Sequence, residues 1–351
     1  MTFTIKQNPP KIILVSCPNW VGDVVMATPT FECIRSNYPD ARIVGLIRQY
    51  AGRVVEDGPW FNDLIRVNDK TFRGALQASL RIRRLNPDFA FVLPNSFRSA
   101  LMARLGGARQ IYGYRRNGRS ALISSGPLPL HENNRFVPRP MVDYYLEICR
   151  WLHLTIPSKP RPQLFMSDTV REKGQRLLKR YCISPDDTVI GINPGAQFGS
   201  SKCWPPAHFA RLADLLSQRL NCQILLFIGP GETEIGDEIV RLSRVKIINT
   251  GPDKVDLALL KPLIQRCQLL VTNDTGPRHY AVAFDVPVVV IMGPTDPRYT
   301  QLNLEKTIVL RREAACSPCH LKQCKLDHRC MTEISPEAVL QAGQRLLRKH
   351  S

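Results

Sequence analysis

The chain has 351 residues, of which 44% are hydrophobic and 22% are charged, and this composition excludes a disordered protein. The length favours two domains of about 150 residues each. Lys and Arg outnumber Asp and Glu by 48 to 30, so the formal net charge is +18. Such an excess indicates an anionic partner, which is nucleic acid, an anionic membrane surface or a phosphorylated substrate.

The sequence offers no signal for membrane insertion or secretion. No apolar run approaches the roughly 18 residues that span a bilayer, and the apolar stretch at 12–15 is far too short for a signal peptide. We therefore expect a cytoplasmic protein. Eleven cysteines do not make a secreted disulfide scaffold at this length, so most should be buried thiols or metal ligands.

Short apolar runs alternate with longer amphipathic runs, a pattern typical of α/β folds built on parallel sheets. In the first half we expect strands at 12–17, 42–47, 63–67 and 88–93, and helices at 30–36 and 75–85. In the second half we expect strands at 188–193, 223–228, 246–248, 268–272 and 287–291, and helices at 206–220, 232–242, 257–265 and 336–349.

The segment IPSKPRPQLF at 156–165 separates the two α/β sets. Its three prolines cannot continue a helix, so we interpret it as a linker. We predict an N-terminal Rossmann-like domain over 1–160, a second Rossmann-like domain over 161–335 and a C-terminal helix over 336–351. Two such domains facing across a cleft would bind ligands at the carboxyl ends of their strands.

The first motif, Pro18-Asn19-Trp20-Val21-Gly22-Asp23, lies between the first predicted strand and a helix. Gly22 permits a tight backbone turn there. Asp23 is then either an N-cap for the helix or a general base that accepts a proton from an attacking hydroxyl. The spacing leaves both roles open.

The second motif, NPGAQFG at 193–199 followed by SSKCWP at 200–205, also lies between a strand and a helix. A glycine-rich turn before the positive end of a helix suits a phosphate. Lys202 would add a point charge for a diphosphate. Neither the Walker A pattern nor GxGxxG is present, and the alternative is a plain turn with a solvated lysine.

The third motif is NDTGPRH at 273–279, directly after a predicted strand. Asp274 and Thr275 are natural N-cap residues, and the same helix start offers free N–H donors to an anion. His279 lies one turn later on the side of Thr275, where a packing or surface role is the alternative to ligand binding. Another loop carries Glu232, which either accepts hydrogen bonds from ribose hydroxyls or begins a helix.

A fourth motif is a group of cysteines within 15 positions, namely Cys316, Cys319, Cys324 and Cys330. Four thiolates fit a structural zinc or iron site, although the usual paired CxxC spacing is missing. His320 or His328 could replace one thiolate. The alternatives are free thiols or, less suited to a reducing compartment, disulfides.

A fifth feature is a field of arginines in the first half. Nine arginines, no lysine and one acid lie between positions 81 and 119, and residues 1–165 carry a net charge of +12. Arginine favours bidentate recognition of phosphate or carboxylate. Arg98 follows a strand, and Arg115 and Arg116 lie in a polar loop, so we expect these three to face the cleft. The alternative is a generally basic surface that helps solubility or weak membrane attachment.

Four segments in this order resemble the bacterial ADP-heptose:lipopolysaccharide heptosyltransferases, most nearly the heptosyltransferase II branch. The resemblance covers nearly the whole chain, and the segments are PNWVGDVVMATPTFECIRSNYPDARI at 18–43, VLPNSFRSAL at 92–101, NPGAQFGSSKCWP at 193–205 and NDTGPRHYAVA at 273–283. The cysteine group occurs in some members of that family only, so it lies outside the shared chemistry.

The resemblance implies a type B glycosyltransferase fold, with the acceptor on the N-terminal domain and the nucleotide sugar on the C-terminal domain. It implies inverting transfer of L-glycero-D-manno-heptose from ADP-heptose to the heptosyl-Kdo2-lipid A inner core. Transfer to another core position or to a protein acceptor is the alternative. No cofactor is expected for catalysis. The expected partners are ADP-heptose, the phosphorylated lipid A-core acceptor and the anionic inner membrane, contacted peripherally.

By the same resemblance, Asp23 would be the general base and Lys202 would steady the diphosphate as it leaves. The donor-binding residues would be Gly195, Gln197, Lys202, Glu232, Asp274, Thr275, Gly276 and His279, and the acceptor-binding residues would be Arg98, Arg115 and Arg116. We do not expect nucleic acid as a partner, because the sequence lacks the aromatic platforms and motifs of nucleic-acid-binding modules.

Overall fold

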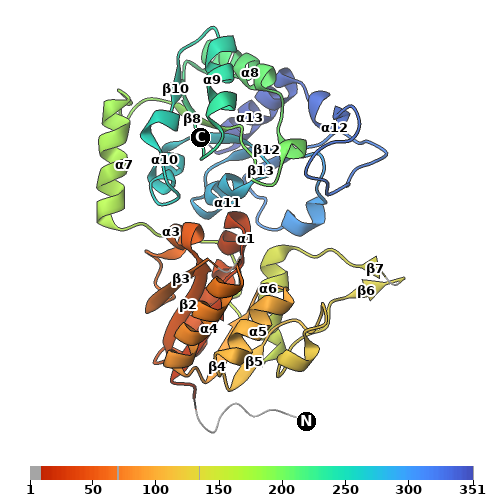
Figure 1. Cartoon of the computed structure of the whole chain (residues 1–351). Coiled ribbons are helices and arrows are strands. Elements are labelled where there is room, and N and C mark those ends of the chain that lie inside the picture. The colour runs from red at the N-terminus through yellow and green to blue at the C-terminus, as the bar shows by residue number, and fades with distance from the viewer. Residues whose placement is uncertain (1–8, 69–70, 134, 351) are drawn as a thin grey trace. The chain divides into compact units, whose positions relative to one another are not determined.

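The computed structural model describes residues 9–68, 71–133 and 135–350, and it divides into two compact units, 1–165 and 166–351. Each unit has its own parallel sheet with helices on both faces (Figure 1). The α/β class predicted from the alternating pattern is therefore confirmed. The division falls at Phe165, at the end of the proline-containing segment.

The first unit is built on a five-stranded parallel sheet in the order β3-β2-β1-β4-β5. Its strands are β1 (Ile12–Ser16), β2 (Arg42–Arg48), β3 (Asp63–Val67), β4 (Phe89–Val92) and β5 (Gln110–Tyr112). Its helices are α1 (Val21–Met26), α2 (Thr28–Asn37), α3 (Gly52–Val55), α4 (Phe72–Leu85), α5 (Phe97–Leu105) and α6 (Met141–Trp151). A small antiparallel hairpin joins β6 (His131–Glu132) to β7 (Arg135–Phe136).

Both faces of the first sheet are covered, which explains why its central strand β1 is apolar except for Ser16. Strand β1 pairs with β2 on one side, with Ile13 opposite Ile43, and with β4 on the other. Helices α4 and α5 pack on one face, where Ile82 and Ala100 join the core with Leu14. Helices α1, α2 and α6 pack against one another away from that core.

The second unit is built on a six-stranded parallel sheet in the order β10-β9-β8-β11-β12-β13. Its strands are β8 (Val189–Asn193), β9 (Gln223–Leu226), β10 (Ile247–Asn249), β11 (Leu269–Asn273), β12 (Val288–Ile291) and β13 (Thr307–Leu310). Its helices are α7 (Asp168–Arg180), α8 (Pro206–Leu220), α9 (Thr233–Leu242), α10 (Leu260–Arg266), α11 (Gly276–Ala283), α12 (Arg329–Thr332) and α13 (Pro336–His350).

The core of the second unit lies between the sheet and helices α8, α9 and α13. Phe209 of α8, Ile239 of α9 and Val339 of α13 are each buried in it. The indole of Trp204 is also buried there, and its Nε1 donates to the carbonyl of Ile334 at 2.9 Å. The C-terminal helix predicted at 336–349 thus packs on the second sheet and helps to close its core.

The strand order changes direction at one point in each sheet. In the first unit this point lies between β1 and β4, and in the second unit it lies between β8 and β11. Ligands of open α/β sheets bind beyond the carboxyl ends of the strands at such a point. The loops that follow these four strands carry the segments singled out in the sequence at 18–23, 92–101, 193–205 and 273–283.

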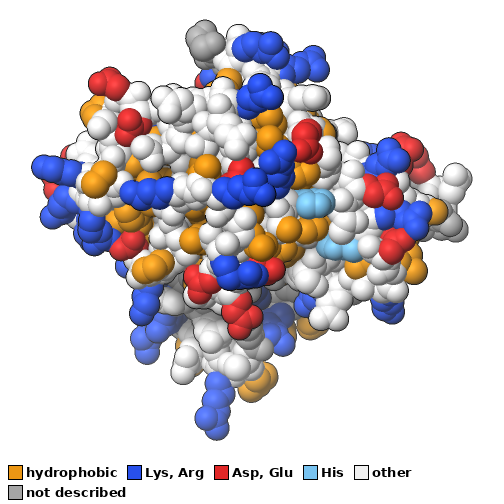
Figure 2. Space-filling model, turned by 90° about the horizontal axis from the view of Figure 1, so that it is seen from above, with side chains coloured by type: hydrophobic (Ala, Val, Ile, Leu, Met, Phe, Trp, Pro, Cys, Tyr) orange, Lys and Arg blue, Asp and Glu red, His pale blue; other side chains and the backbone are white. Residues whose placement is uncertain are grey.

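Charged side chains are spread over the surface. On the face drawn in Figure 2, Lys and Arg side chains are widely distributed and acidic side chains lie among them. Among the described residues, no helix is both long enough and apolar enough to cross a membrane.

Candidate active site

In the second unit, side chains join the loops after β8 and β11. Asn193 Nδ2 donates to Thr275 Oγ1 at 3.3 Å, and Asn273 Nδ2 donates to the carbonyl of Pro194 at 2.6 Å. Asn273 Oδ1 also accepts from the backbone N–H of Trp204 at 3.1 Å. The second and third sequence motifs therefore meet at the carboxyl edge of the second sheet.

Lys202 is held in place at this edge by an aspartate. The 3₁₀ turn Ser200–Lys202 places its ammonium so that Nζ donates to Asp274 Oδ2 at 2.9 Å and to the Asp274 carbonyl at 3.0 Å. The Lys202 side chain is only 13% exposed, and Nζ lies 5.1 Å from the centre of the Phe198 ring. The solvated lysine considered as the alternative is therefore wrong.

Asp274 is the centre of a buried charge cluster and does not cap α11. Arg278 Nη1 donates to its Oδ1 at 2.7 Å, and Thr295 Oγ1 donates to its Oδ2 at 2.6 Å. Burial by itself would raise the pKa of Asp274, but Arg278, Lys202 and Thr295 outweigh it and hold that pKa well below its usual range. The N-cap of α11 is Thr275, which makes no side-chain capping bond.

The cluster carries one net positive charge, because two cations, Lys202 and Arg278, meet the single carboxylate of Asp274. His279 adds no charge at neutral pH. Burial, together with the nearby Arg278, lowers the pKa of His279 to about 3, so its ring is neutral. A buried site with one surplus positive charge suits an anionic group such as a diphosphate.

Glu232 lies in the loop after β9, against the backbone of that loop. Its Oε2 accepts from the Gly229 N–H at 2.8 Å, and burial raises the pKa of Glu232 despite that bond. A Cβ at Gly195 would lie 1.9 Å from the Glu232 carboxyl, so only glycine leaves room for it there. Glu232 is the N-cap residue of α9 by position, yet its carboxylate does not cap that helix.

The remaining residues expected to bind the donor lie in the loop after β8 and at the start of α11. Gly276 begins α11 and is half-buried, and Gln197 is exposed in the loop after β8. Gly199 has a φ of +153° and would direct a Cβ to 2.2 Å from the carbonyl of Lys322. Glycine is therefore required for the turn that leads to Lys202.

In the first unit, the structure pairs Asp23 with a tyrosine. Asp23 lies in the first turn of α1, whose N-cap is Trp20, so the N-cap role for Asp23 is wrong. Its Oδ1 accepts a hydrogen bond from Tyr145 Oη of α6 at 2.8 Å. Tyr145 is buried, and burial together with the Asp23 carboxylate raises the pKa of its hydroxyl well above the usual value. The hydroxyl therefore stays protonated and donates.

A second polar group lies at the same edge of the first sheet. Tyr144 Oη donates to Asn95 Oδ1 at 3.0 Å and accepts from Arg116 Nη1 at 3.2 Å. The Arg116 guanidinium also lies 4.7 Å from the centre of the Phe136 ring. Asn95 follows β4, so this group lies beyond the strand that neighbours β1.

The arginines of the first half have different environments. Arg98 is exposed in the first turn of α5, whereas Arg115 and Arg116 are half-buried in the loop after β5. Arg119 is fully buried, and its guanidinium donates to the backbone carbonyls of Tyr114 and Pro94. Arg119 thus holds loops of the fold together.

Comparison with known proteins identifies the family. The profile of glycosyltransferase family 9 (heptosyltransferase) matches residues 75–329, which is more than half of the chain. The chain belongs to glycosyltransferase family 9. It is therefore a glycosyltransferase, and the resemblance inferred from the four sequence segments is confirmed.

Relatives of this family 9 enzyme match it along nearly its whole length. It is 28% identical to lipooligosaccharide heptosyltransferase 2 of Campylobacter jejuni over 96% of this chain and 98% of the relative. It is 29% identical to lipopolysaccharide heptosyltransferase 2 of Escherichia coli K12 over 95% of this chain and 98% of the relative. The solved structure of E. coli ADP-heptose lps heptosyltransferase II matches with a TM-score of 0.79 at 27% identity, covering 96% of this chain and 98% of that one.

The four cysteines of this family 9 enzyme lie near one another, and burial together with Cys316, Cys324 and Cys319 raises the pKa of the Cys330 thiol. Cys330 is buried in α12 against Gly293, Cys316 is exposed, and the Sγ of Cys324 accepts a hydrogen bond from the Leu326 N–H. Within the described ranges, no three His, Cys, Asp or Glu side chains are placed to hold a metal ion. The metal site expected at Cys316, Cys319, Cys324 and Cys330 stays a prediction.

Several polar residues of both sites are missing from the sequence-based prediction. They are Asn95, Tyr144, Tyr145, Arg278 and Thr295. Thr295 follows the predicted strand at 287–291, so its position at the carboxyl edge of the sheet could have indicated it as a site residue. The pairing of Tyr145 with Asp23 spans 122 positions and has no local signal in the sequence.

Proposed function

We propose that this family 9 enzyme transfers L-glycero-D-manno-heptose from ADP-heptose to the heptosyl-Kdo2-lipid A inner core of lipopolysaccharide, with inversion at the anomeric carbon. The observation that carries the donor side is the buried cluster of Lys202, Asp274 and Arg278 at the switch point of the second sheet. The names of the relatives, which include heptosyltransferases 2 of Campylobacter jejuni and Escherichia coli, support the acceptor.

We assign the donor diphosphate to the second unit. Lys202, held by Asp274, would contact the phosphates and stabilise the negative charge that grows on ADP as it leaves. Gly195, Gln197, Thr275 and Gly276 would supply backbone and side-chain contacts from the two loops. Glu232 would accept hydrogen bonds from the ribose hydroxyls. His279 would contact the donor with an uncharged ring.

We assign the acceptor to the first unit, with Asp23 as the general base. Asp23 would take the proton from the acceptor hydroxyl while that oxygen forms a bond to the anomeric carbon of the donor. The bond from that carbon to the phosphate oxygen breaks, and its electron pair leaves with ADP. Arg98, Arg115 and Arg116 would bind acidic groups of the phosphorylated core.

The proposed acceptor is anchored in a membrane, so we place the enzyme at the cytoplasmic surface of the inner membrane, in peripheral contact with it. No step of the proposed reaction is assigned to a metal or other cofactor. The net charge of +18 would favour this anionic surface as well as the phosphorylated acceptor.

The test is a transfer assay with ADP-heptose and a panel of truncated core acceptors. Release of ADP with the heptosyl-Kdo2-lipid A acceptor, and not with the acceptor that lacks the first heptose, supports the proposal. Transfer to a different core position or to a protein would replace the acceptor assignment, and NMR of the product reports the anomeric configuration. Absence of transfer to every acceptor would overturn the proposed function.

A further inference from the structure

The outward face of helix α4 is unusually apolar for a surface helix. Phe72 is 81% exposed, Leu76 is 46% exposed and Leu80 is 51% exposed. These residues are four positions apart, so they form one stripe along the helix. Ala78 and Ile82, on the opposite side, are fully buried in the core of the first unit, so the stripe is not needed to attach α4 to the sheet.

Basic side chains lie beside this stripe. Helix α4 has four arginines, at 73, 81, 83 and 84, and no acidic residue. Arg73 and Arg81 occupy the next row of the helix, one position after Phe72 and Leu80. Within the described ranges Arg73, Arg83 and Arg84 make no ion pair, and all three side chains are exposed.

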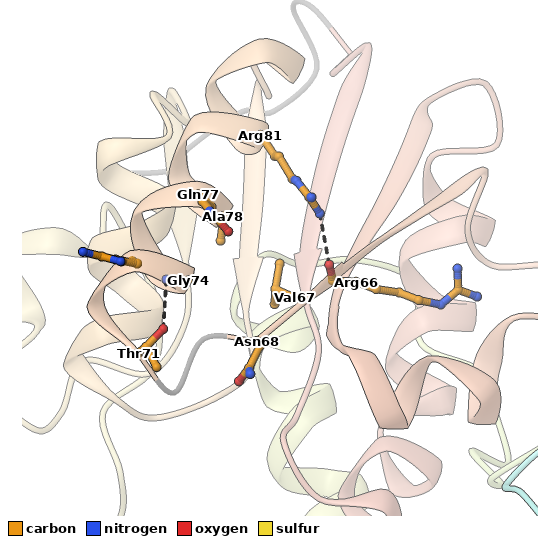
Figure 3. Close-up of a pocket in the computed structure, with 9 residues that line it drawn as sticks. Arg66, Val67, Asn68, Thr71, Gly74, Gln77, Ala78 and Arg81 are labelled. Carbon is orange, nitrogen blue, oxygen red and sulfur yellow. Dashed lines mark hydrogen bonds between the residues drawn. The ribbon is translucent and has the colours of Figure 1, made fainter.

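A pocket of about 280 Å³ lies beside the row of α4 that contains Arg73 and Arg81 (Figure 3). It lies between the end of β3 and the start of α4 and is lined by Arg66, Arg73 and Arg81 among others. Arg81 Nη1 donates to the carbonyl of Arg66 at 3.2 Å, while the guanidinium of Arg66 pairs with Glu56 at 2.7 Å. Helix α4 therefore presents the apolar stripe next to a row that contains Arg73 and Arg81.

We propose that this outward face of α4, the docking face, rests on an anionic lipid bilayer. Phe72, Leu76 and Leu80 would enter the interfacial region, and the arginines would meet the acidic headgroups. An amphipathic helix with Phe and Leu on one side and basic residues on the other is suited to lie in the plane of an anionic membrane surface. Three exposed large apolar side chains in one row also exceed the scattered apolar residues of an ordinary soluble surface.

The charge pattern favours lipid over a protein partner. A protein partner for this face would have to present an acidic rim that follows one helix, whereas an anionic bilayer offers negative charge in every direction. The neighbouring helix α5 ends in Arg104 and Leu105, both exposed, so the same pairing of basic and apolar residues continues beyond α4. The proposal rests on the proposed function only in that a lipid-anchored acceptor gives the enzyme a reason to bind membranes.

The experiment is co-sedimentation of the full chain with vesicles. The probes are phosphatidylethanolamine–phosphatidylglycerol vesicles and, for comparison, neutral phosphatidylcholine vesicles. One variant combines Phe72→Ser, Leu76→Ser and Leu80→Ser, and a second combines Arg73→Gln, Arg83→Gln and Arg84→Gln. Matched controls on the second unit are Val240→Ser with Leu242→Ser and Leu326→Ser, and Arg171→Gln with Lys173→Gln and Lys179→Gln, all at exposed positions.

We expect the unaltered protein to bind the anionic vesicles, with weaker binding at high salt and on neutral vesicles. Each docking-face variant should bind at least about tenfold more weakly, and the controls should bind as the unaltered protein does. Equal binding by the serine variant, or no binding by the unaltered protein, overturns the proposal. A change from dimer to monomer in the serine variant would also overturn it, since the face would then join two copies.

A transfer assay with a deacylated, water-soluble acceptor separates docking from chemistry. Both docking-face variants should keep the unaltered rate on this acceptor and lose rate only on vesicle-embedded acceptor. Loss of rate on the soluble acceptor would overturn the proposal, because the face would then belong to the acceptor site. Failure of the unaltered protein to transfer heptose at all would overturn the proposed function and leave the vesicle result standing.

Discussion

Tyr145 Oη donates a hydrogen bond to Asp23 Oδ1 across 2.8 Å, and this bond joins α6 to the first turn of α1. A hydrogen bond to a carboxylate favours its ionised form and fixes its orientation. The proposed general base is thus held by a buried residue that does not itself need to touch substrate. Tyr145 is, in this proposal, a positioning residue.

Replacing Asp23 by Asn should lower kcat by about 100-fold or more, because the acceptor hydroxyl would lose its proton acceptor. The measurement is ADP release under saturating donor and acceptor. A variant with nearly unaltered kcat would remove the base role from Asp23.

Tyr145→Phe should cause a smaller loss and should move the acidic limb of the kcat/KM profile to higher pH, since the carboxylate would lose a donor that favours its charged form. Tyr114→Phe is the matched control, because Tyr114 is a buried tyrosine whose hydroxyl has no partner among the described residues. A purely structural role for Tyr145 would lower the amount of active enzyme and leave the position of the limb unchanged.

Lys202→Ala should lower kcat strongly, because the developing charge on the leaving diphosphate would lose its nearest cation. Asp274→Asn should lower stability as well as activity, since it leaves Lys202 and Arg278 without their shared carboxylate, at a cost of about 3–5 kcal/mol for a broken buried pair. The measurements are ADP release and the thermal unfolding midpoint. Lys322→Ala, at an exposed position of the same unit, is the control. Unchanged kinetics for Lys202→Ala would contradict its proposed role.

Gly195→Ala should raise the KM for ADP-heptose, because its Cβ would occupy the space of the Glu232 carboxyl. Glu232→Ala should also raise that KM, and the double variant should be no worse than the more severe single variant, since the two changes remove the same feature. Additive effects of the two substitutions would show that Gly195 and Glu232 act separately.

The stability of the enzyme should fall as the pH is lowered from about 6.5 towards 3. Burial lowers the pKa of His279 to about 3, so in this window the unfolded chain binds a proton that the folded chain does not. The effect is about 1.4 kcal/mol per pH unit for one group. Thermal midpoints of His279→Gln should vary less with pH than those of the unaltered protein. His131→Gln, at an exposed position, should show the full dependence, and an equal slope for His279→Gln would refute the assignment.

Much of the fold was predictable because the strands of both sheets are buried on two faces and appear as short apolar runs. Helix α8 has the bounds predicted for it, and β3 does as well. The edge strands β5 and β13 were missed: β5 has only three residues, and all four residues of β13 are only partly buried. Helix α6 was also missed, because its tyrosines give no clear helical signal in the sequence.

The candidate sites were predictable where they follow strands and unpredictable where they depend on contacts between distant segments. Asp23, Lys202 and Asp274 all follow predicted strands, so the carboxyl edges of the sheets indicated them. The capping roles considered for Asp23 and Asp274 were wrong, because tertiary partners bind both carboxylates instead. The cysteine spacing predicts a metal site, and that site stays a prediction; the structure adds that Cys330 lies on α12 and belongs to the core of the second unit.

The anchoring of Asp274 by three different segments has a consequence for substrate binding. Lys202, Arg278 and Thr295 come from the loop after β8, from α11 and from the loop after β12, and each donates to the protein's own carboxylate Asp274. The entropy cost of orienting the Lys202 ammonium therefore falls mostly on folding. Little of that cost lowers the affinity for the donor. A preorganised cation of this kind can respond to charge that develops on a leaving group without first moving itself.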